Sequence, residues 1–280
     1  MKKYTILLFT ILFTSIAFSQ KRAKISGSKV VTTEQKEIGA FENLEIEDNL
    51  EVSLVKGDKC GIEIDADENL HKEINISLNG NTLRLTTAKE IVSFKKLNIK
   101  ITYTDDFKML IAKHSSSITA LSDLKLDNIT IKCFDYSKIF VNVKSKSFTL
   151  MANDKSKIEL NLLSEETTIE LSKNAQIKAL LATGKLKFDM YQKSSATVEG
   201  DIADMKLRTD NSTTFNGKNL TVKTAEILCE SDSKLEVNVT SKAIVEASGK
   251  SEIQFYGDGK VELKKFADNA VIMKKSLKLK

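Results

Sequence analysis

A repeat of about nineteen residues runs through the second half of the chain and constrains its fold more than any other feature. The phrase SDSKLEVNV at 231–239 has two near copies, DYSKIFVNV at 135–143 and DKSKIELNL at 154–162. Nine units align on the apolar residue that follows a turn of small residues, at Ile118, Ile139, Ile158, Ile177, Val198, Phe215, Leu235, Ile253 and Ile272. Such a period is typical of a solenoid, in which each unit buries its apolar face only by stacking on its neighbours.

The columns of this alignment separate interior positions from surface positions. The position two residues before the anchor always holds Ser, Ala or Thr, and the position eight before it is large and apolar except at Lys264. In that last unit we expect Val261 and Leu263 to point inward instead. Apolar and polar residues alternate within each unit, which indicates strands with one packed side, and the unit is too short for a crossover helix. The sequence therefore predicts an all-β fold, a right-handed parallel β-helix.

The region before the repeat divides into three segments. Residues 1–19 combine two lysines, an apolar run and a small-residue cleavage site, which predicts a signal peptide and export to the periplasm, the cell surface or the medium. Residues 20–40 lack alternation and are expected to be a flexible lead. Residues 41–112 are expected to form irregular strands and first coils that cover the apolar end of the solenoid, with hairpin turns at KGDK (56–59) and NGNT (79–82). Regular coils are expected over 113–280, with a lysine-rich tail guarding the last edge.

Cysteine usage and charge exclude several classes of protein. Three cysteines, Cys60, Cys133 and Cys229, are an odd number, so disulfides are not expected to hold the fold together. Cys133 and Cys229 fall in a column of small residues and are predicted to be buried. The formal net charge of +5 and three scattered arginines do not indicate nucleic-acid binding. No motif for a metal, a cofactor or a catalytic nucleophile is present, and no later segment is apolar enough to span a membrane.

One column offers a weak candidate surface. Four residues before the anchor stand Asp135, Asp154, Asn211 and Asp268, which could stack into a ridge that binds a cation or a basic partner. The column is interrupted by His114, Lys173, Ser194, Ser231 and Gly249, and turns favour Asp, Asn, Ser and Gly for their backbone alone. The acids at Asp65, Asp67 and Glu68 are interpreted as solvated turn residues. Candidate aromatic platforms for sugars are Tyr136, Tyr191 and Tyr256.

Several stretches of the chain resemble a known family. They are FENLEI (41–46), EVSLVKGDK (51–59), IEIDADENL (62–70), NTLRLTT (81–87) and LNIKITYTDDFKMLIAKHSSSI (97–118). They are similar to exported bacterial proteins of the "putative auto-transporter adhesin, head GIN domain" family, over nearly all of the mature chain. The resemblance implies a β-helix and an adhesin-like role. The chain departs from the family at 113–116 and 154–156, where Gly-Ser-Gly turns are usual, and at Asp105-Asp106, a place that often holds Pro.

Three functions remain open from the sequence. The first is a non-enzymatic, adhesin-like scaffold that binds a cell-surface glycan or protein; the regular repeat without a catalytic cluster favours it. The second is a β-helical carbohydrate-active enzyme that acts on polysaccharide through the Asp column. The third is a structural protein of the cell envelope. No cofactor is expected, and the oligomeric state stays open.

Overall fold

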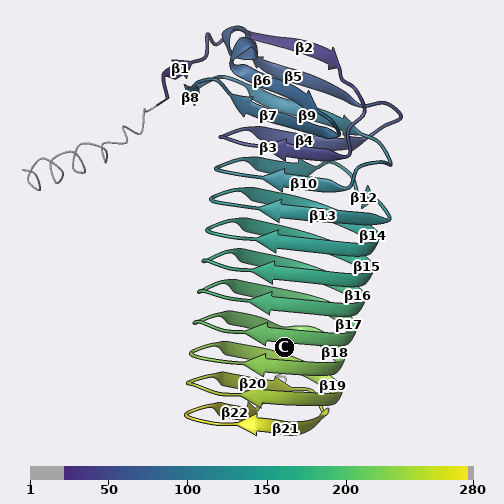
Figure 1. Ribbon diagram of the computed structural model, residues 1–280, viewed down its shortest axis with the longest axis vertical. Helices are drawn as coiled ribbons and strands as arrows, with labels where there is room; N and C mark the ends of the chain where they lie inside the picture. Colours follow the sequence, from purple (N-terminus) through teal and green to yellow (C-terminus); the bar gives the residue numbers. More distant parts are fainter. Residues whose placement is uncertain (1–21, 277–280) are drawn as a thin grey trace, which may run out of the picture.

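The protein is a β-solenoid of about nine turns (Figure 1), and the predicted fold class is confirmed. The computed structural model describes residues 22–276, so the predicted signal peptide at 1–19 lies outside the described residues. Strands make up 67% of the structure and helix 2%. Within residues 22–276, none of the helical structure is long and apolar enough to cross a membrane.

Each regular coil is one long strand that bends in its middle, so that a first arm and a second arm run along opposite faces of the solenoid (Figure 1). Neighbouring coils pair in parallel, with Ile139 beside Ile158 and Ile158 beside Ile177. Buried hydroxyls support one bend: Ser164 lies 2.5 Å from Thr167 and 3.1 Å from Thr183, oxygen to oxygen. These coils are β14 (Lys138–Ala152), β15 (Lys157–Leu171), β16 (Gln176–Met190), β17 (Ser195–Thr209), β18 (Thr214–Cys229) and β19 (Lys234–Ala247).

One unit of the sequence alignment was placed two residues out of register. The residue that pairs with the anchor Ile177 is Ala196. Val198, which was aligned as the anchor, pairs instead with Ala179, two residues after Ile177. The error arose because Ala196 is small enough to fit the small-residue column, whose true member in this unit is the buried Ser194. The column eight residues before the anchor shifts in the same way, so that Phe188 and not Met190 stacks between Ile169 and Leu207. With this correction the spacing between paired coils stays at nineteen residues from Ile139 to Phe215.

The first coils are not stacked in chain order. The coil made of β3 (Asn43–Ile46) and β4 (Glu51–Lys56) lies between two coils that follow it in sequence. On one side β3 pairs with β7 and β4 with β9, and on the other side β3 pairs with β10 and β4 with β11. The flanking strands are β7 (Thr82–Thr87), β9 (Leu97–Tyr103), β10 (Met109–Ala112) and β11 (Ser117–Ala120). β12 (Leu124–Lys125) and β13 (Asn128–Cys133) then pair with β14 and start the regular stack.

Antiparallel strands close the N-terminal end (Figure 1). β5 (Gly61–Asp67) pairs with β9 and β2 (Val31–Glu37), and β6 (Ile74–Asn79) forms a hairpin with β7 through the predicted turn at NGNT. The predicted hairpin at KGDK is wrong, because β9 lies between β4 and β5. The short 3-10 helix η1 (Glu68–Glu73) buries Leu70 at this end.

The expected lead at 20–40 contains two strands. β1 (Lys24–Ser26) pairs in parallel with β8 (Glu90–Ser93), and β2 pairs with β5 over seven residues. Their side chains are mostly exposed, so the segment has no buried alternation for a sequence pattern to reveal. Strand pairing also continues across residue 112, where β10 belongs to the same stack as β13. The division of the chain into domains at these boundaries stays a prediction.

A single apolar core runs from Phe41 to Phe255 between the two arms. Cys133 stacks between Ala112 and Ala152, and Cys133 and Cys229 are both buried and free, as predicted. Burial raises the pKa of the Cys133 thiol, and it raises that of Cys229 to about 11. The core ends at the last full coil, which consists of β20 (Glu252–Tyr256) and β21 (Lys260–Phe266), and β22 (Val271–Lys274) adds one more first arm on β20. Val261 and Leu263 pair with the inward residues Ala243 and Val245 as predicted.

Candidate functional site

The residues predicted to form an acidic ridge share one backbone position. Asp135, Asp154, Asn211 and Asp268 have φ between 59° and 61°, in the turn that joins one coil to the next. Asp and Asn tolerate this left-handed region better than most residues with a side chain. Lys173 and Gln192 occupy the same position between Asp154 and Asn211, and Gln192 replaces the expected Ser194. Only Asp135 and Asp154 lie on adjacent turns, because three coil spacings, about 14 Å, separate Asp154 from Asn211.

The carboxylates of this column already have partners. Asp135 accepts a hydrogen bond of 3.0 Å from the backbone N–H of His114, and Asp268 accepts one of 2.9 Å from Gly249. Asp154 lies 3.8 Å from the Lys173 ammonium group. These contacts tie each turn to its neighbour, which is a structural role. Binding of a cation or a basic partner by the ridge stays a prediction.

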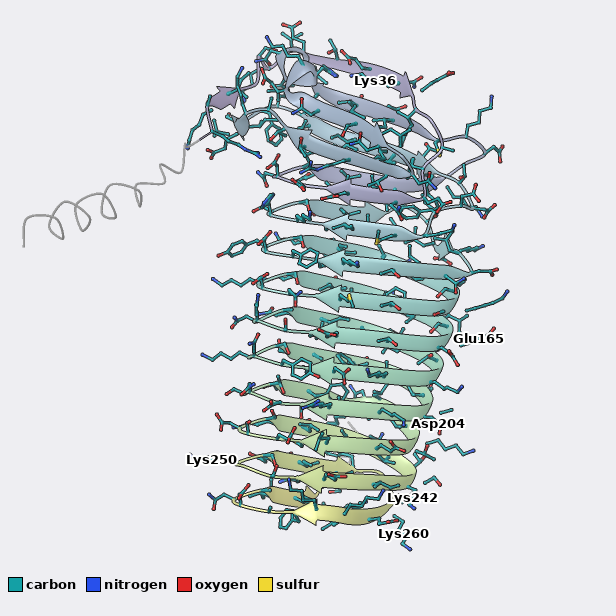
Figure 2. All side chains as sticks on the ribbon, in the orientation of Figure 1. Lys36, Glu165, Asp204, Lys242, Lys250 and Lys260 are labelled. Carbon is teal, nitrogen blue, oxygen red and sulfur yellow. The ribbon has the colours of Figure 1, made fainter. Side chains whose placement is uncertain are left out.

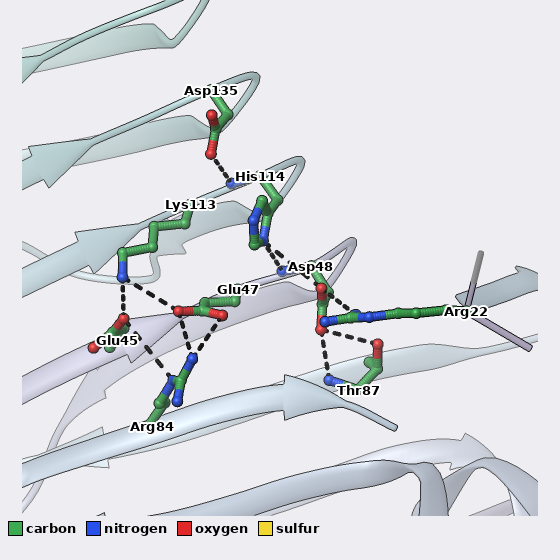
Figure 3. Close-up of polar contacts among 9 residues, drawn as sticks. All are labelled: Arg22, Glu45, Glu47, Asp48, Arg84, Thr87, Lys113, His114 and Asp135. Carbon is green, nitrogen blue, oxygen red and sulfur yellow. Dashed lines mark hydrogen bonds and ion pairs between the residues drawn. The ribbon is translucent and has the colours of Figure 1, made fainter. Parts of the chain in front are cut away.

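The most concentrated set of charges lies at the N-terminal end of the stack (Figure 3). Glu45 on β3 and Glu47 just after it face Arg84 on β7 and Lys113 just after β10. Because β3 lies between β7 and β10, the two acids are placed between the two cations. Arg84 donates to both oxygens of Glu47 at 2.9 and 3.0 Å, and Lys113 lies 3.3 Å from one of them. We call these four residues the charged clamp.

Electrostatics inside the clamp favour the ionised form of Glu47. Its side chain is only 7% exposed, and burial by itself would raise the pKa of this carboxyl. Hydrogen bonding with Glu45, Arg84 and Lys113 outweighs burial and lowers the pKa of Glu47 to about 2. The same contacts raise the pKa of Arg84 and of Lys113. The clamp therefore holds a buried carboxylate that is ionised near neutral pH and joins three strands.

Asp48 extends these contacts to the N-terminal lead (Figure 3). Its carboxylate pairs with Arg22 and accepts hydrogen bonds from the backbone N–H and the hydroxyl of Thr87, at 2.7 and 3.0 Å. The Asp48 backbone N–H in turn donates to His114 Nδ1 at 3.4 Å. Asp48 also has a left-handed backbone, with φ of 64°, so it is an early member of the turn column.

This arrangement fits a structural joint better than a catalytic centre. General acid–base catalysis needs a group that can gain and lose a proton near the working pH, and a carboxyl with a pKa of about 2 cannot do so near neutrality. Within residues 22–276, no three His, Cys, Asp or Glu side chains are grouped so that they could hold a metal ion. The clamp therefore joins the coils to the N-terminal cap, the antiparallel strands β2, β5 and β6 with β7 and β9 that close this end.

Asp67 was misjudged from the sequence. It is fully buried, not solvated, and it accepts hydrogen bonds from the backbone N–H groups of Lys29, Lys95 and Lys96 at 3.0 to 3.2 Å. Burial would raise the pKa of this carboxyl, but the three backbone donors lower it. A period-two strand pattern at 61–67 was visible in the sequence, but the backbone donors come from 28 to 38 residues away and carry no sequence signal.

An open groove lies on the first arms of β14 to β17 and reaches β11 at one end. It has a volume of about 490 Å³ and follows two outward columns of side chains up the stack. One column contains Asn142, Asn161, Leu180 and Glu199, and the other contains Phe140, Glu159, Lys178 and Thr197. Asn161 donates a hydrogen bond of 2.8 Å to the Asn142 side chain. We call this surface the first-arm groove.

Sequence reasoning missed the first-arm groove, although one signal was present. Outward positions of the strands are mostly polar, but Phe140 and Leu180 are apolar, and Leu180 is 53% exposed. These two breaks in the alternation lie two coils apart on neighbouring columns. Single exposed apolar residues are common on protein surfaces, so the signal is that these two lie close together on neighbouring columns.

The three tyrosines considered as sugar platforms lie elsewhere. Tyr136 is 58% exposed at a turn, with the Lys155 ammonium group 5.2 Å from its ring centroid. Tyr191 has the Arg208 guanidinium 5.6 Å from its ring centroid. Tyr256 is buried and has Lys218 beside its ring. The structure does not bring them together, so they form no shared platform.

Comparison with solved structures supports the fold. The chain is similar to a "putative adhesin from Parabacteroides distasonis", with 17% identity and a TM-score of 0.64 over 89% of this chain and 99% of the other. It is also similar to a "putative adhesin from Parabacteroides merdae", with 18% identity and a TM-score of 0.57 over 91% and 98%. A "putative lipid binding protein" from Parabacteroides distasonis has 16% identity and a TM-score of 0.56 over 90% and 96%. At these identities the likeness shows the fold alone.

Comparison with curated proteins gave no match. The family model described as "Putative auto-transporter adhesin, head GIN domain" matches residues 40–179 and 161–259. The two matches together include the N-terminal strands from β3 onward, the charged clamp, the first-arm groove and most of the regular coils. The chain therefore belongs to the "Putative auto-transporter adhesin, head GIN domain" family.

Proposed function

We propose that this protein is an exported, non-enzymatic, adhesin-like scaffold that binds an elongated cell-surface ligand along the first-arm groove. The observation that carries the proposal is the groove itself, an open hollow of about 490 Å³ that extends across β11 and the first arms of β14 to β17. The family to which the chain belongs is described as adhesin-like, which supports a role in surface interaction. The predicted signal peptide supports export.

The chemistry of the groove suits a glycan. Half-buried Phe140 and exposed Leu180 offer apolar surface to the faces of sugar rings. Asn142, Asn161 and Glu199 offer amide and carboxylate groups to hydroxyls. The columns repeat at the spacing between strands, about 4.8 Å, so successive coils present one side chain from each column along an extended ligand. A cell-surface protein is the other ligand that we keep open.

The proposal of a non-enzymatic role is supported by how the acids are used. Glu47, Asp48 and Asp67 are held by cations or by backbone N–H groups in contacts that join strands. The two glutamates of the groove, Glu159 and Glu199, lie on coils two apart and on different columns. A glycosidase needs two carboxyl groups facing each other across one bond.

A glycan array with the purified mature chain is the direct test. We expect binding to a defined set of extended glycans, with Phe140→Ala and Leu180→Ala each reducing it at least tenfold. Such a loss corresponds to about 1.4 kcal/mol, a normal value for truncating an apolar contact residue. Met151→Ala, a matched control with a 40% exposed side chain on the second arm of β14, should bind like the wild type.

Two results would count against this proposal. One is the absence of binding to any glycan or cell-surface extract, and the other is equal binding by Leu180→Ala and the wild type. Turnover of a polysaccharide would contradict the non-enzymatic role. The predicted ridge is tested in the same experiment: Asp135→Ala and Asp154→Ala should leave glycan binding unchanged if these residues only link turns, and a loss of binding would assign them to the site.

A further inference from the structure

The last coil ends the apolar core without covering it. Val261, Leu263 and Phe266 are 38%, 50% and 53% exposed, whereas their partners in the preceding coil, Ala243, Val245 and Ala247, are at most 1% exposed. In the described residues β21 pairs only with β19 and β22 only with β20. The C-terminal end of the solenoid therefore presents an apolar surface bordered by strand edges with open hydrogen-bonding groups.

Lysines surround this apolar surface. Between 260 and 275 the chain has five lysines and two acids, at Lys260, Lys264, Lys265, Lys274 and Lys275 against Glu262 and Asp268. Both acids are engaged, because Glu262 pairs with Lys242 at 2.8 Å and Asp268 accepts from the backbone of Gly249. Four of the lysines, all except Lys274, make no ion pair within residues 22–276. We call this surface the basic end. It consists of the apolar residues Val261, Leu263 and Phe266 and the lysines Lys260, Lys264, Lys265 and Lys275, of which Figure 2 labels Lys260.

Another coil of the same kind fits the basic end poorly. Lys274 stands in the column that holds buried Phe255 one coil earlier, and the pairing of β21 with β19 is irregular after Leu263. Lysines and bulges are devices that stop strand edges from pairing. A second copy of the chain, related by a two-fold axis, would place like charges against like.

We propose that the basic end docks onto an anionic lipid surface. Apolar side chains can enter the boundary between headgroups and acyl chains, while lysines bordering them meet phosphate groups. Leu263 and Phe266 supply the apolar side chains, and Lys264 and Lys265 beside them supply the charges that meet the phosphates. The two parts are needed together, since one weak anchor alone gives only marginal membrane binding. Docking at this end orients the solenoid away from the membrane and leaves the first-arm groove open.

Flotation of the purified mature chain with lipid vesicles tests the proposal. We expect it to float with vesicles of phosphatidylcholine mixed with phosphatidylglycerol, to float much less with phosphatidylcholine alone, and to be released by high salt. Changing Lys264→Gln and Lys265→Gln together should weaken partitioning by roughly 25-fold, at about fivefold for each lysine near an anionic surface. Leu263→Ser with Phe266→Ser should weaken it by at least tenfold.

Matched controls separate docking from general effects. Lys138→Gln with Lys157→Gln removes two exposed lysines from β14 and β15, several coils away from the basic end, and Leu163→Ser removes an apolar side chain that is 54% exposed on β15. Both controls should float like the wild type, and circular dichroism should show the same strand content in all variants. Leu180→Ala should also float normally, so failure of the glycan proposal and failure of this one are distinguishable.

Three results would overturn the proposal. They are equal flotation with neutral and anionic vesicles, equal flotation of all variants, and no flotation at all. If the chain instead forms a dimer in light scattering that Leu263→Ser with Phe266→Ser abolishes, and does not float, the occupant of this end is a second copy.

Discussion

The charged clamp makes a prediction that depends on pH in a defined direction. We expect Glu47→Gln to lower the free energy of unfolding at neutral pH, because it removes the carboxylate that Arg84 and Lys113 hold between β7, β3 and β10. The carboxyl has a pKa of about 2 in the folded protein against an ordinary value of 4.5. Its contribution is therefore fully present above pH 4.5 and is lost as the pH falls towards 2.

The size of the effect follows from the same numbers. One pKa unit corresponds to about 1.4 kcal/mol, so the shift from 4.5 to about 2 sets an upper value of roughly 3 kcal/mol. Arg84 is 47% exposed, and water around it weakens the attraction. We therefore expect Glu47→Gln to cost about 2 kcal/mol at pH 7 and much less near pH 2.5.

Urea unfolding of the wild type and the variant at several pH values measures this difference. Comparing the two proteins at each pH removes the contribution of the other acids with lowered pKa values, such as Asp67 and Glu262. Glu165→Gln is the control, since this exposed residue makes no ion pair within residues 22–276 and should unfold like the wild type at every pH (Figure 2). A difference that stays constant from pH 7 to pH 2.5 would refute the reasoning.

Three further predictions concern the backbone, the thiols and the cap. Gly200 has φ of 114°, and a Cβ there would lie 2.0 Å from the Leu181 carbonyl oxygen. Gly200→Ala should therefore lower the free energy of unfolding by about 1–3 kcal/mol or more, as measured by thermal unfolding. The control is Gly61→Ala, whose Cβ would meet nothing closer than 4.0 Å and which should change that free energy by less than about 1 kcal/mol. Iodoacetamide should label only Cys60 in the folded protein, since Cys133 and Cys229 are buried with raised pKa values, and mass spectrometry of a second labelled site would contradict this. Asp67→Asn should loosen residues 24–37 and speed their hydrogen exchange, because it weakens acceptance from three backbone N–H groups, whereas unchanged exchange would show that the strand pairing alone holds them.

The regular coils could be predicted from the sequence because their partners lie nineteen residues away and repeat. Each column is then sampled many times, so that a single poor member such as Lys264 does not hide it. The same averaging failed at Ala196, where one small residue fits two columns equally well. The register of this unit is determined by the packing of the whole coil, in which Ser194 and not Ala196 occupies the buried small-residue position.

The cap and the functional surfaces were harder to predict for physical reasons. β9 inserts between β4 and β5 although KGDK has good hairpin chemistry, because pairing with distant strands outweighed the local turn preference. The charged clamp joins residues 37 to 68 positions apart, and no local pattern marks such contacts. The turn column was correctly interpreted as compatible with turn chemistry, and its left-handed backbone at Asp135 and Asp154 gives the reason.

The order of the first coils has a consequence for how the chain can assemble. β3 and β4 emerge early, yet the strands on either side of them, β7 and β9 and then β10 and β11, come later in the sequence. This coil therefore has no neighbouring coil until residue 103 has been synthesised, and it lacks the second one until residue 120. Once β10 and β11 are in place, every later coil finds its partner one repeat behind it. Folding should thus begin with a slow step in which about a hundred residues form the first coils through long-range strand pairing. The later coils should then add rapidly, one after another, towards the C-terminus.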